Sequence, residues 1–229
     1  MQLFHYPLCP HSRFVRLALG EAGLDVRLVE EKPWARRRDY LEVSPSGETP
    51  TLLERFGLAI PGAATIAEYL DETYGEAMGE RRLLPSLPSE RVEARRLVDW
   101  FGRKFHDEVS RWLVHEKVYK ARMSAEEGGG GPDMAPIRAA RYNVKAHLRY
   151  VGALARGRRW LAGDRMTFAD LAAAAQLSVV DYLGEVPWAE SAAAKDWYAK
   201  VKSRPSFRPL LAETQPGLPP PAHYADLDF

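Results

Sequence analysis

The sequence predicts a two-part chain, an α/β domain followed by an all-α domain. Strand and helix patterns alternate over residues 1–76, whereas the later apolar patterns have helical spacing. Residues 77–88 contain Pro85 and Pro88 and predict a linker between the two parts. We therefore expect domains at 1–76 and 89–214 and a separate C-terminal tail at 215–229. A chain of 229 residues is long enough for two small cores.

The first part contains four expected strands and three expected helices. Alternating apolar residues predict the strands, and apolar residues at helical spacing predict the helices. A mixed sheet with helices on both faces satisfies this order of elements. In chain order we expect a strand at 2–6, a helix at 10–22, a strand at 25–31, a short helix at 36–43, a hairpin of 51–55 and 56–60 turning near 54–57, and a helix at 63–74.

The second part is expected to be helical until the tail. Four consecutive glycines, residues 128–131, must end the first long helix. The tail has Pro216 and three further prolines at 219–221, so we expect it to be extended. The expected helices cover residues 90–120, 136–155, 167–182 and 189–203.

Composition limits the classes of function. The formal net charge is +1, which gives little general attraction to nucleic acid or to anionic membranes. Cys9 is the single cysteine, so we expect no disulfide within the chain and no cysteine-based metal site. We see no signal peptide and no apolar run of about 18 residues. We therefore expect a cytoplasmic protein without membrane insertion and without a metal.

Cys9 lies in the turn between the first strand and the first helix. Residues 6–16 read YPLCPHSRFVR, so Cys9 directly precedes the helix that we expect from Pro10. A helix N-terminus lowers the pKa of a thiol through its dipole and its free N–H groups. The alternative is that Cys9 is a small capping or packing residue.

Three more stretches carry recognisable local patterns. Residues 161–170 place Thr167 as a helix N-cap and Asp170 three residues later, as in a capping box. Residues 47–52 read GETPTL, and residues 66–70 have the apolar face of a helix. Together with the turn before the first helix, these stretches resemble the glutathione S-transferase family.

The resemblance implies a thioredoxin-like N-terminal domain and an all-helical C-terminal domain. It also implies a cis peptide bond before Pro50, in a turn where the backbone of Thr49 pairs with the peptide of glutathione. By the same resemblance, Cys9 or Ser12 would lie close to the thiol of glutathione.

Two residues depart from the family pattern. Members of the family usually place an acidic residue and a serine just before the helix at 63–74, where they bind the γ-glutamyl group. Gly62 and Ala63 occupy these positions and offer neither a charge nor a hydroxyl. Because each charge-assisted hydrogen bond contributes about 1.5–3 kcal/mol, losing both weakens binding by about two orders of magnitude. We therefore expect only a vestigial glutathione site, formed by Thr49, Pro50, Gly62 and Ala63.

Two classes of function follow. The first is a cytosolic glutathione transferase or a glutathione-dependent thiol reductase, with Cys9 or Ser12 at the chemistry and glutathione as cofactor. A single cysteine supports only monothiol chemistry, because no resolving cysteine exists. The second is a non-catalytic protein that keeps the scaffold, needs no cofactor and binds another protein through its surface.

The surface hypothesis depends on two segments. Trp34 precedes a run of three arginines, and aromatic residues with arginine are enriched at binding hot spots. The tail mixes aromatic and acidic residues, so it either docks on a partner as an extended peptide or packs back on its own helical domain. The expected partner-binding residues are Trp34, Arg36, Arg37, Arg38, Tyr224, Asp226, Asp228 and Phe229.

The tail, the missing side chains at 62 and 63, and the stretch EKPW at 31–34 resemble more specifically the glutathione S-transferase-like division proteins of alphaproteobacteria. This resemblance implies a homodimer that binds polymers of the tubulin-like protein FtsZ at the division site. It also implies that the protein changes the curvature and bundling of the filaments without glutathione chemistry. A third alternative, nucleic-acid binding through the arginines at 36–38 and 156–159, has no recognised motif to support it.

Overall fold

A four-stranded mixed sheet forms the middle of the N-terminal domain in the computed structural model, which describes residues 1–227. The strands are β1 (Gln2–His5), β2 (Arg27–Glu30), β3 (Thr51–Leu53) and β4 (Ala59–Pro61). Their order is β2-β1-β3-β4, with β1 parallel to β2 and antiparallel to β3, which is antiparallel to β4. Leu3 and Leu52 lie opposite each other on the central strands and are fully buried. The mixed sheet of the predicted fold class is therefore confirmed.

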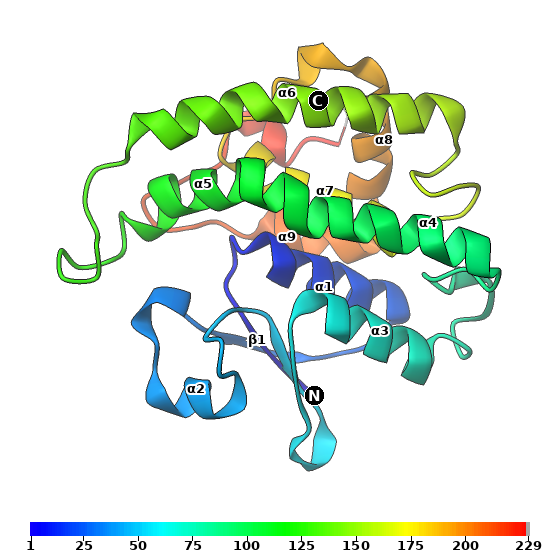
Figure 1. Ribbon diagram of the computed structural model, residues 1–229, viewed down its shortest axis with the longest axis horizontal. Coiled ribbons are helices and arrows are strands. Elements are labelled where there is room, and N and C mark those ends of the chain that lie inside the picture. The colour runs from blue at the N-terminus through cyan, green and yellow to red at the C-terminus, as the bar shows by residue number, and fades with distance from the viewer. Residues whose placement is uncertain (228–229) are drawn as a thin grey trace.

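Three helices accompany the sheet: α1 (Pro10–Ala22), α2 (Arg38–Val43) and α3 (Ala63–Tyr74). Pro10 starts α1 directly after its N-cap Cys9, and Gly23 ends it with φ 69°, a left-handed conformation that glycine adopts without strain. Helices α1 and α3 lie between the sheet and the helical domain, and α2 lies at the edge of the molecule away from that domain (Figure 1). The predicted bounds of α1 and α3 are confirmed, whereas α2 begins two residues later than expected.

The β3–β4 connection differs from the expected hairpin. Both strands are shorter than predicted, because Arg55–Gly57 forms a tight 3₁₀ turn between them. Phe56 has φ 66°, a left-handed conformation that cannot continue a strand. Its ring is fully exposed. The predicted strand at residues 56–60 is therefore wrong in its first half.

One long helical rod begins the helical domain. It runs without a break from α4 (Pro88–Asp99) through α5 (Arg111–Val114) to Tyr119. The segments Trp100–Ser110 and His115–Tyr119 have wider, π-helical turns. The loop that contains the four glycines then leads to α6 (Met134–Gly157). The predicted long helix and its interruption are both confirmed.

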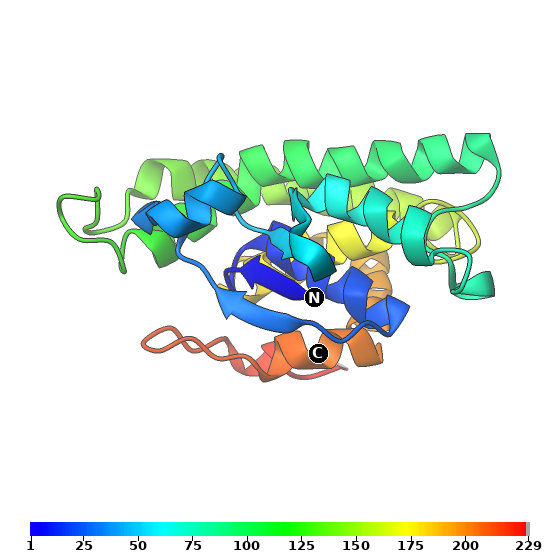
Figure 2. The same ribbon diagram turned by 90° about the horizontal axis from the view of Figure 1, so that it is seen from below.

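Helix α7 (Phe168–Tyr182) is the centre of the helical domain. All of its residues are buried, and its contacts include α1, α4 and the π-helical segment before α5. Helices α8 (Ala192–Lys202) and α9 (Arg208–Ala212) follow it. Figure 2 shows α9 and the C-terminal segment on one side of α1, and the α4–α5 rod on the other. The core therefore continues from the sheet through α1 into α7.

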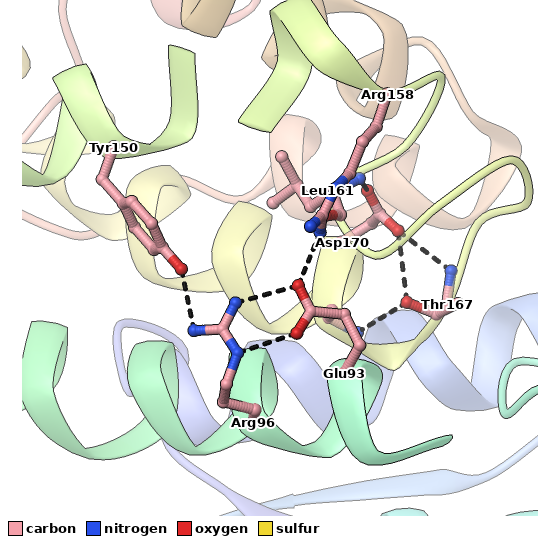
Figure 3. A network of polar contacts seen from close by, with 8 residues as sticks. Glu93, Arg96, Tyr150, Arg158, Leu161, Thr167 and Asp170 are labelled. Atoms are coloured by element: carbon pink, nitrogen blue, oxygen red, sulfur yellow. Dashed lines mark hydrogen bonds and ion pairs between the residues drawn. The ribbon is translucent and has the colours of Figure 1, made fainter. Parts of the chain in front are cut away.

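The predicted capping box starts α7. The Thr167 hydroxyl accepts a hydrogen bond from the Ala169 N–H at 3.2 Å, and the Asp170 carboxylate accepts one from the Thr167 N–H at 2.9 Å. The other Asp170 oxygen accepts hydrogen bonds from the Leu161 N–H at 2.9 Å and the Trp197 indole N–H at 3.0 Å. Asp170 thus ties the loop before α7 and helix α8 to the start of α7. Figure 3 shows its contacts with Leu161 and Thr167.

A surface network beside this cap joins α4 to α6. The Glu93 carboxylate accepts two hydrogen bonds from Arg96 and one from Arg158, and Arg96 also donates to the Tyr150 hydroxyl (Figure 3). These arginines lower the pKa of Glu93 to about 2, although partial burial opposes the shift. The network holds the C-terminal part of α6, and the residue that follows it, against the α4 end of the rod.

The C-terminal segment packs back on its own helical domain. The Tyr182 hydroxyl accepts from the Gln215 N–H at 2.7 Å and donates to the Leu218 carbonyl at 2.8 Å. Tyr224 is fully buried, and its ring meets that of Tyr182 edge-on at 5.2 Å. Of the two tail alternatives, the described part of the tail therefore adopts the packed arm.

Candidate functional site

Cys9 lies at the N-terminus of α1, beside the interface of the two domains. Its sulfur accepts a hydrogen bond from the Ser12 N–H at 3.4 Å and lies 3.4 Å from the Thr49 carbonyl oxygen, to which the thiol donates. The side chain is the N-cap of the helix, so the capping interpretation of Cys9 is confirmed. A capping sulfur at this position is also the one that helix N–H groups activate, so capping and reactivity are compatible.

A histidine pair modifies the chemistry of this thiol. Burial raises the pKa of Cys9, but hydrogen bonding and charge from His11 outweigh it and lower this pKa to about 7. The His11 ring donates from Nε2 to the Gly102 carbonyl at 2.8 Å and lies 4.4 Å from the ring of His106. Burial opposes protonation of His11, whereas Cys9 favours it, and the net effect raises the pKa of His11. Above pH 7 Cys9 is therefore mainly a thiolate, and its charge favours protonation of the neighbouring His11 ring.

The turn at Thr49 has the backbone form that the family resemblance implies. The peptide bond between Thr49 and Pro50 is cis. Thr49 is nine-tenths buried, and its hydroxyl has no hydrogen-bond partner among the described residues. Thr49 and Pro50 line a cavity at this turn, and Thr49 also lines the cavity next to it.

A cavity of about 440 Å³ lies between this turn and the start of α3. Gly62 and Ala63 line it, and no side chain caps the helix there. The nearest lining acid on α3 is Glu68, whose carboxylate is held by Arg95 at 2.7 and 2.8 Å. The cavity therefore has the shape of a ligand site, but the two positions before α3 contribute neither charge nor hydroxyl to it.

A second cavity of about 520 Å³ adjoins the first and shares His11, Glu48 and Thr49 with it. Cys9 lines this second cavity, together with side chains from the α4–α5 rod. Burial and the charge on His11 lower the pKa of His106 to about 3, so that ring is neutral at pH 7. The rod contributes His106, Asp107, Arg111, Trp112, Val114, His115 and Tyr119.

Ser12 is placed away from both cavities. It is fully buried and does not line either of them, and its hydroxyl accepts a hydrogen bond from the Tyr6 N–H at 3.3 Å. Its contacts hold the strand-to-helix turn in place. The geometry thus favours Cys9 over Ser12 for any chemistry in the cleft.

Trp34 is half-buried in an aromatic cluster. Its ring lies 5.2 Å from the Tyr6 ring and 4.9 Å from the Tyr119 ring. Tyr119 ends the helical rod, so this contact joins the two domains. Part of the Trp34 ring remains accessible to a partner.

The arginine run divides into two kinds of residue. Arg37 is already paired within the protein: its guanidinium donates hydrogen bonds of 2.8 and 3.1 Å to Glu31, which is 1% exposed. Arg36 and Arg38 on either side are exposed and form no hydrogen bond or ion pair with another described residue. The accessible charge of this surface therefore comes from Arg36 and Arg38.

The structure corrects the prediction for one tail residue, Tyr224. Tyr224 was expected to contact a partner, but its hydroxyl accepts from Arg13 at 2.9 Å and donates to the Leu210 carbonyl at 3.2 Å in the core. A fully buried side chain offers no surface to a partner, so Tyr224 is a structural residue. Asp226 is exposed, and its carbonyl accepts from Lys202. The predictions for Asp228 and Phe229 concern residues outside the described range.

Residues 1–227 contain no group of three His, Cys, Asp or Glu side chains arranged to hold a metal ion. Within the same range, no helix has both the length and the apolar character to cross a membrane. The histidines of the second cavity were missed from the sequence. His11 adjoins the Cys9 motif and could have been noticed, whereas His106 carries no local signal because it comes from a distant helix.

Comparison with known proteins assigns the family. The model of the glutathione S-transferase N-terminal domain matches residues 3–78, and that of the C-terminal domain matches residues 137–205. FtsZ-localized protein A from Caulobacter vibrioides is 47% identical to the chain, over 99% of this chain and 97% of that protein.

Solved structures agree in fold. A glutathione S-transferase from Sinorhizobium meliloti superposes with a TM-score of 0.98 at 50% identity, covering 100% of this chain and 99% of its own. FzlA from C. crescentus superposes with a TM-score of 0.91 at 47% identity, with the same coverage. The chain therefore belongs to the glutathione S-transferase family.

Proposed function

We propose that this chain binds filaments of FtsZ and regulates their curvature and bundling during bacterial cell division. The observation that carries the proposal is the 47% identity to FtsZ-localized protein A along nearly the whole of both chains. The proposed site of action is the cytoplasm at the division site. No cofactor takes part in the proposed activity.

The cleft supports a non-catalytic role. Gly62 and Ala63 leave the start of α3 without the side chains that would hold a γ-glutamyl group. The lost charge-assisted hydrogen bonds correspond to about a hundredfold weaker binding of glutathione. In this proposal the cleft has lost its ligand, while the scaffold has kept its shape.

The proposed filament-binding surface lies around α2. Trp34 offers a half-buried aromatic ring, and Arg36 and Arg38 offer two exposed guanidinium groups near it. Arginine and tryptophan are the residue types that contribute most to binding at protein interfaces. In the proposal, Asp226 and the end of the tail add acidic contacts to the same partner.

A homodimer is part of the proposal. A symmetric dimer presents each surface twice, so it engages two subunits of a filament and gains avidity. The fully exposed Phe56 and half-exposed Leu58 at the β3–β4 turn offer an apolar patch for a second copy. If they form the contact, Phe56→Ser should convert the dimer to a monomer in light scattering coupled to size-exclusion chromatography. A dimer with unchanged stability in that variant would exclude this patch.

Co-sedimentation with GTP-polymerised FtsZ from the same organism tests the proposal. We expect the protein to pellet with polymer at physiological salt and to remain in the supernatant when GDP replaces GTP. Arg36→Glu/Arg38→Glu should reduce the pelleted fraction, and Arg208→Glu, on the exposed face of α9, is the control. Failure of the wild-type protein to pellet at micromolar concentrations would refute the proposal.

A second candidate function is glutathione-dependent transfer or thiol reduction at Cys9. The observation that favours it is the thiol with a pKa of about 7 beside His11, at the wall of a cavity. Isothermal titration with glutathione, with Cys9→Ala as the control, separates the two candidates. Micromolar affinity together with glutathione-dependent turnover would favour the enzyme, whereas millimolar or weaker affinity without turnover would favour the non-catalytic protein.

A further inference from the structure

Helix α6 has an unusual charge pattern. Its 24 residues contain four arginines and one lysine, but no aspartate or glutamate. The whole chain, by contrast, has nearly equal numbers of acidic and basic residues. A surface helix that is stabilised by its own ion pairs would alternate the two signs, and α6 does not.

The cations lie along the exposed face of the helix. Arg138, Tyr142, Lys145, Arg149 and Arg156 follow one another at spacings of three, four or seven residues and are all exposed. Tyr142, the second residue of this row, has 78% of its surface exposed. We call these five residues the α6 stripe. The opposite face of the helix is buried against the domain.

Acids from a neighbouring connection neutralise only part of this charge. Glu190, which follows α7, pairs with Lys145 at 3.3 Å and with Arg149 at 3.3 Å. Arg138 and Arg156, near the two ends of the stripe, form no ion pair or hydrogen bond with the other described residues. The stripe therefore keeps an uncompensated positive charge at each end and an aromatic ring between them.

The helix dipole accounts for the position of Arg156 but not for that of Arg138. Arg156 lies in the last turn of α6, where a positive charge is favoured by the helix dipole. Arg138 lies near the N-terminus, where the same dipole disfavours a cation. The exposed Tyr142 next to it buries little surface within the domain. Arg138 and Tyr142 thus have no structural role that the fold requires.

We infer that the α6 stripe is a docking surface for an acidic segment of a partner polypeptide. Arg138 and Arg156 are about 27 Å apart along the helix, which an extended segment of about eight residues spans. Acidic side chains at the two ends of such a segment would meet the two arginines, and an apolar side chain between them would cover Tyr142. Arginine and tyrosine are both enriched at binding hot spots.

Polypeptide fits this surface better than nucleic acid. A phosphate backbone carries closely and regularly spaced negative charges, and on the stripe these would meet the Glu190 carboxylate between the two free arginines. An acidic peptide places its charges only at the positions that suit the stripe. Figure 1 shows α6 at the edge of the molecule opposite α2, so this surface is separate from the proposed filament-binding surface. The inference does not depend on filament binding.

Fluorescence anisotropy with a labelled synthetic peptide tests the inference. The probe has glutamates at both ends and a phenylalanine about two residues from one end, because Tyr142 lies about 6 Å from Arg138 along the helix. Its counterpart has glutamine in place of each glutamate. The test variant is Arg138→Glu/Arg156→Glu. The control is Arg165→Glu/Arg208→Glu, which changes the net charge equally at exposed positions outside α6. Circular dichroism establishes that both variants are folded.

The expected result is saturable binding of the acidic probe at physiological salt and no binding of its glutamine counterpart. The test variant should bind about tenfold more weakly, Tyr142→Ala should bind several-fold more weakly, and the control should be unchanged. Equal losses in the test and control variants would overturn the inference, because they would indicate attraction to net charge alone. No binding by the wild-type protein would also overturn it, as would tighter binding of single-stranded RNA or of anionic vesicles.

Discussion

The two ends of helix α1 differ in how tightly they pack against the helical domain. At the C-terminal end, Glu21 is buried and accepts two hydrogen bonds of 2.6 Å from Arg204 and one from Ser206. Gly20 lies so close to Ser206 that an added Cβ would approach the serine Cβ within 3.0 Å. At the N-terminal end, Cys9 lies against two adjoining cavities, and the buried Thr49 hydroxyl there has no partner among the described residues.

The difference separates the part of the interface that stabilises the fold from the part that keeps a ligand-sized space. Close packing and paired charges at one end give the domains a fixed relative position. Unpaired polar groups and open volume at the other end contribute little to stability. Selection for the scaffold alone would preserve the first end, so the state of the second end reports on function.

The largest expected effect is the loss of Arg13, which anchors the tail to α1. Its guanidinium donates to the Pro7 carbonyl at 2.8 Å, to the Ser178 hydroxyl at 3.0 Å and to the Tyr224 hydroxyl. Arg13→Met leaves these acceptors unpaired, and we expect the free energy of unfolding to fall by about 3–4 kcal/mol. Urea denaturation measures it. A loss as small as that of the exposed control Arg165→Met would contradict the structural role.

A smaller effect is expected at the closed end of α1. Glu21→Gln keeps the shape of the side chain but removes the charge that pairs with Arg204, so the free energy of unfolding should fall by about 2 kcal/mol. The control is Glu72→Gln on the exposed face of α3. If both variants unfold at the same urea concentration, the ion pair does not hold this end closed.

At the N-terminal end of α1, the expected effect is on the reactivity of the Cys9 thiol. Because the pKa of folded Cys9 is about 7, its alkylation by iodoacetamide should rise with pH around a midpoint near 7, compared with about 8.5 for the unfolded chain. His11→Ala removes the hydrogen bond and the charge that lower the pKa of Cys9, so it should shift the midpoint upward. If both folded proteins have the same midpoint, His11 does not lower the pKa of Cys9.

The smallest effect is expected at Thr49. Its hydroxyl is buried without a partner, so Thr49→Val should change the free energy of unfolding by less than about 1 kcal/mol or increase it slightly. The matched control is Thr51→Val, which removes a hydroxyl 3.0 Å from that of Tyr40 and should be destabilising by about 1–2 kcal/mol. The reverse ranking would mean that Thr49 makes a stabilising contact.

Local signals explain which parts of the fold could be predicted. Proline at the first position of α1 and glycine after its end define that helix, and the Thr167–Asp170 box defines the start of α7. The β3–β4 turn could not be predicted, because Phe56 adopts a backbone conformation that its residue type disfavours. The packed tail could not be predicted either, since proline content indicates an extended chain but not the surface that receives it.

The same limit applies to the site. Cys9 could be located from its position before a helix, and Gly62 and Ala63 from the family pattern. The contacts of His11 with His106 and of Trp34 with Tyr119 join segments far apart in the chain, so they depend on how the domains pack. Arg37 resembled its neighbours in sequence, yet its guanidinium is already paired with the buried Glu31, although the side chain itself stays exposed.

The most direct test of the central claim is a side-by-side co-sedimentation of three proteins with GTP-polymerised FtsZ: the wild type, Cys9→Ser and Arg36→Glu/Arg38→Glu. The account predicts that Cys9→Ser pellets with the polymer as the wild type does, whereas the arginine variant remains largely in the supernatant. Loss of pelleting in Cys9→Ser, with the arginine variant unaffected, would contradict the account and would place the function in the cleft.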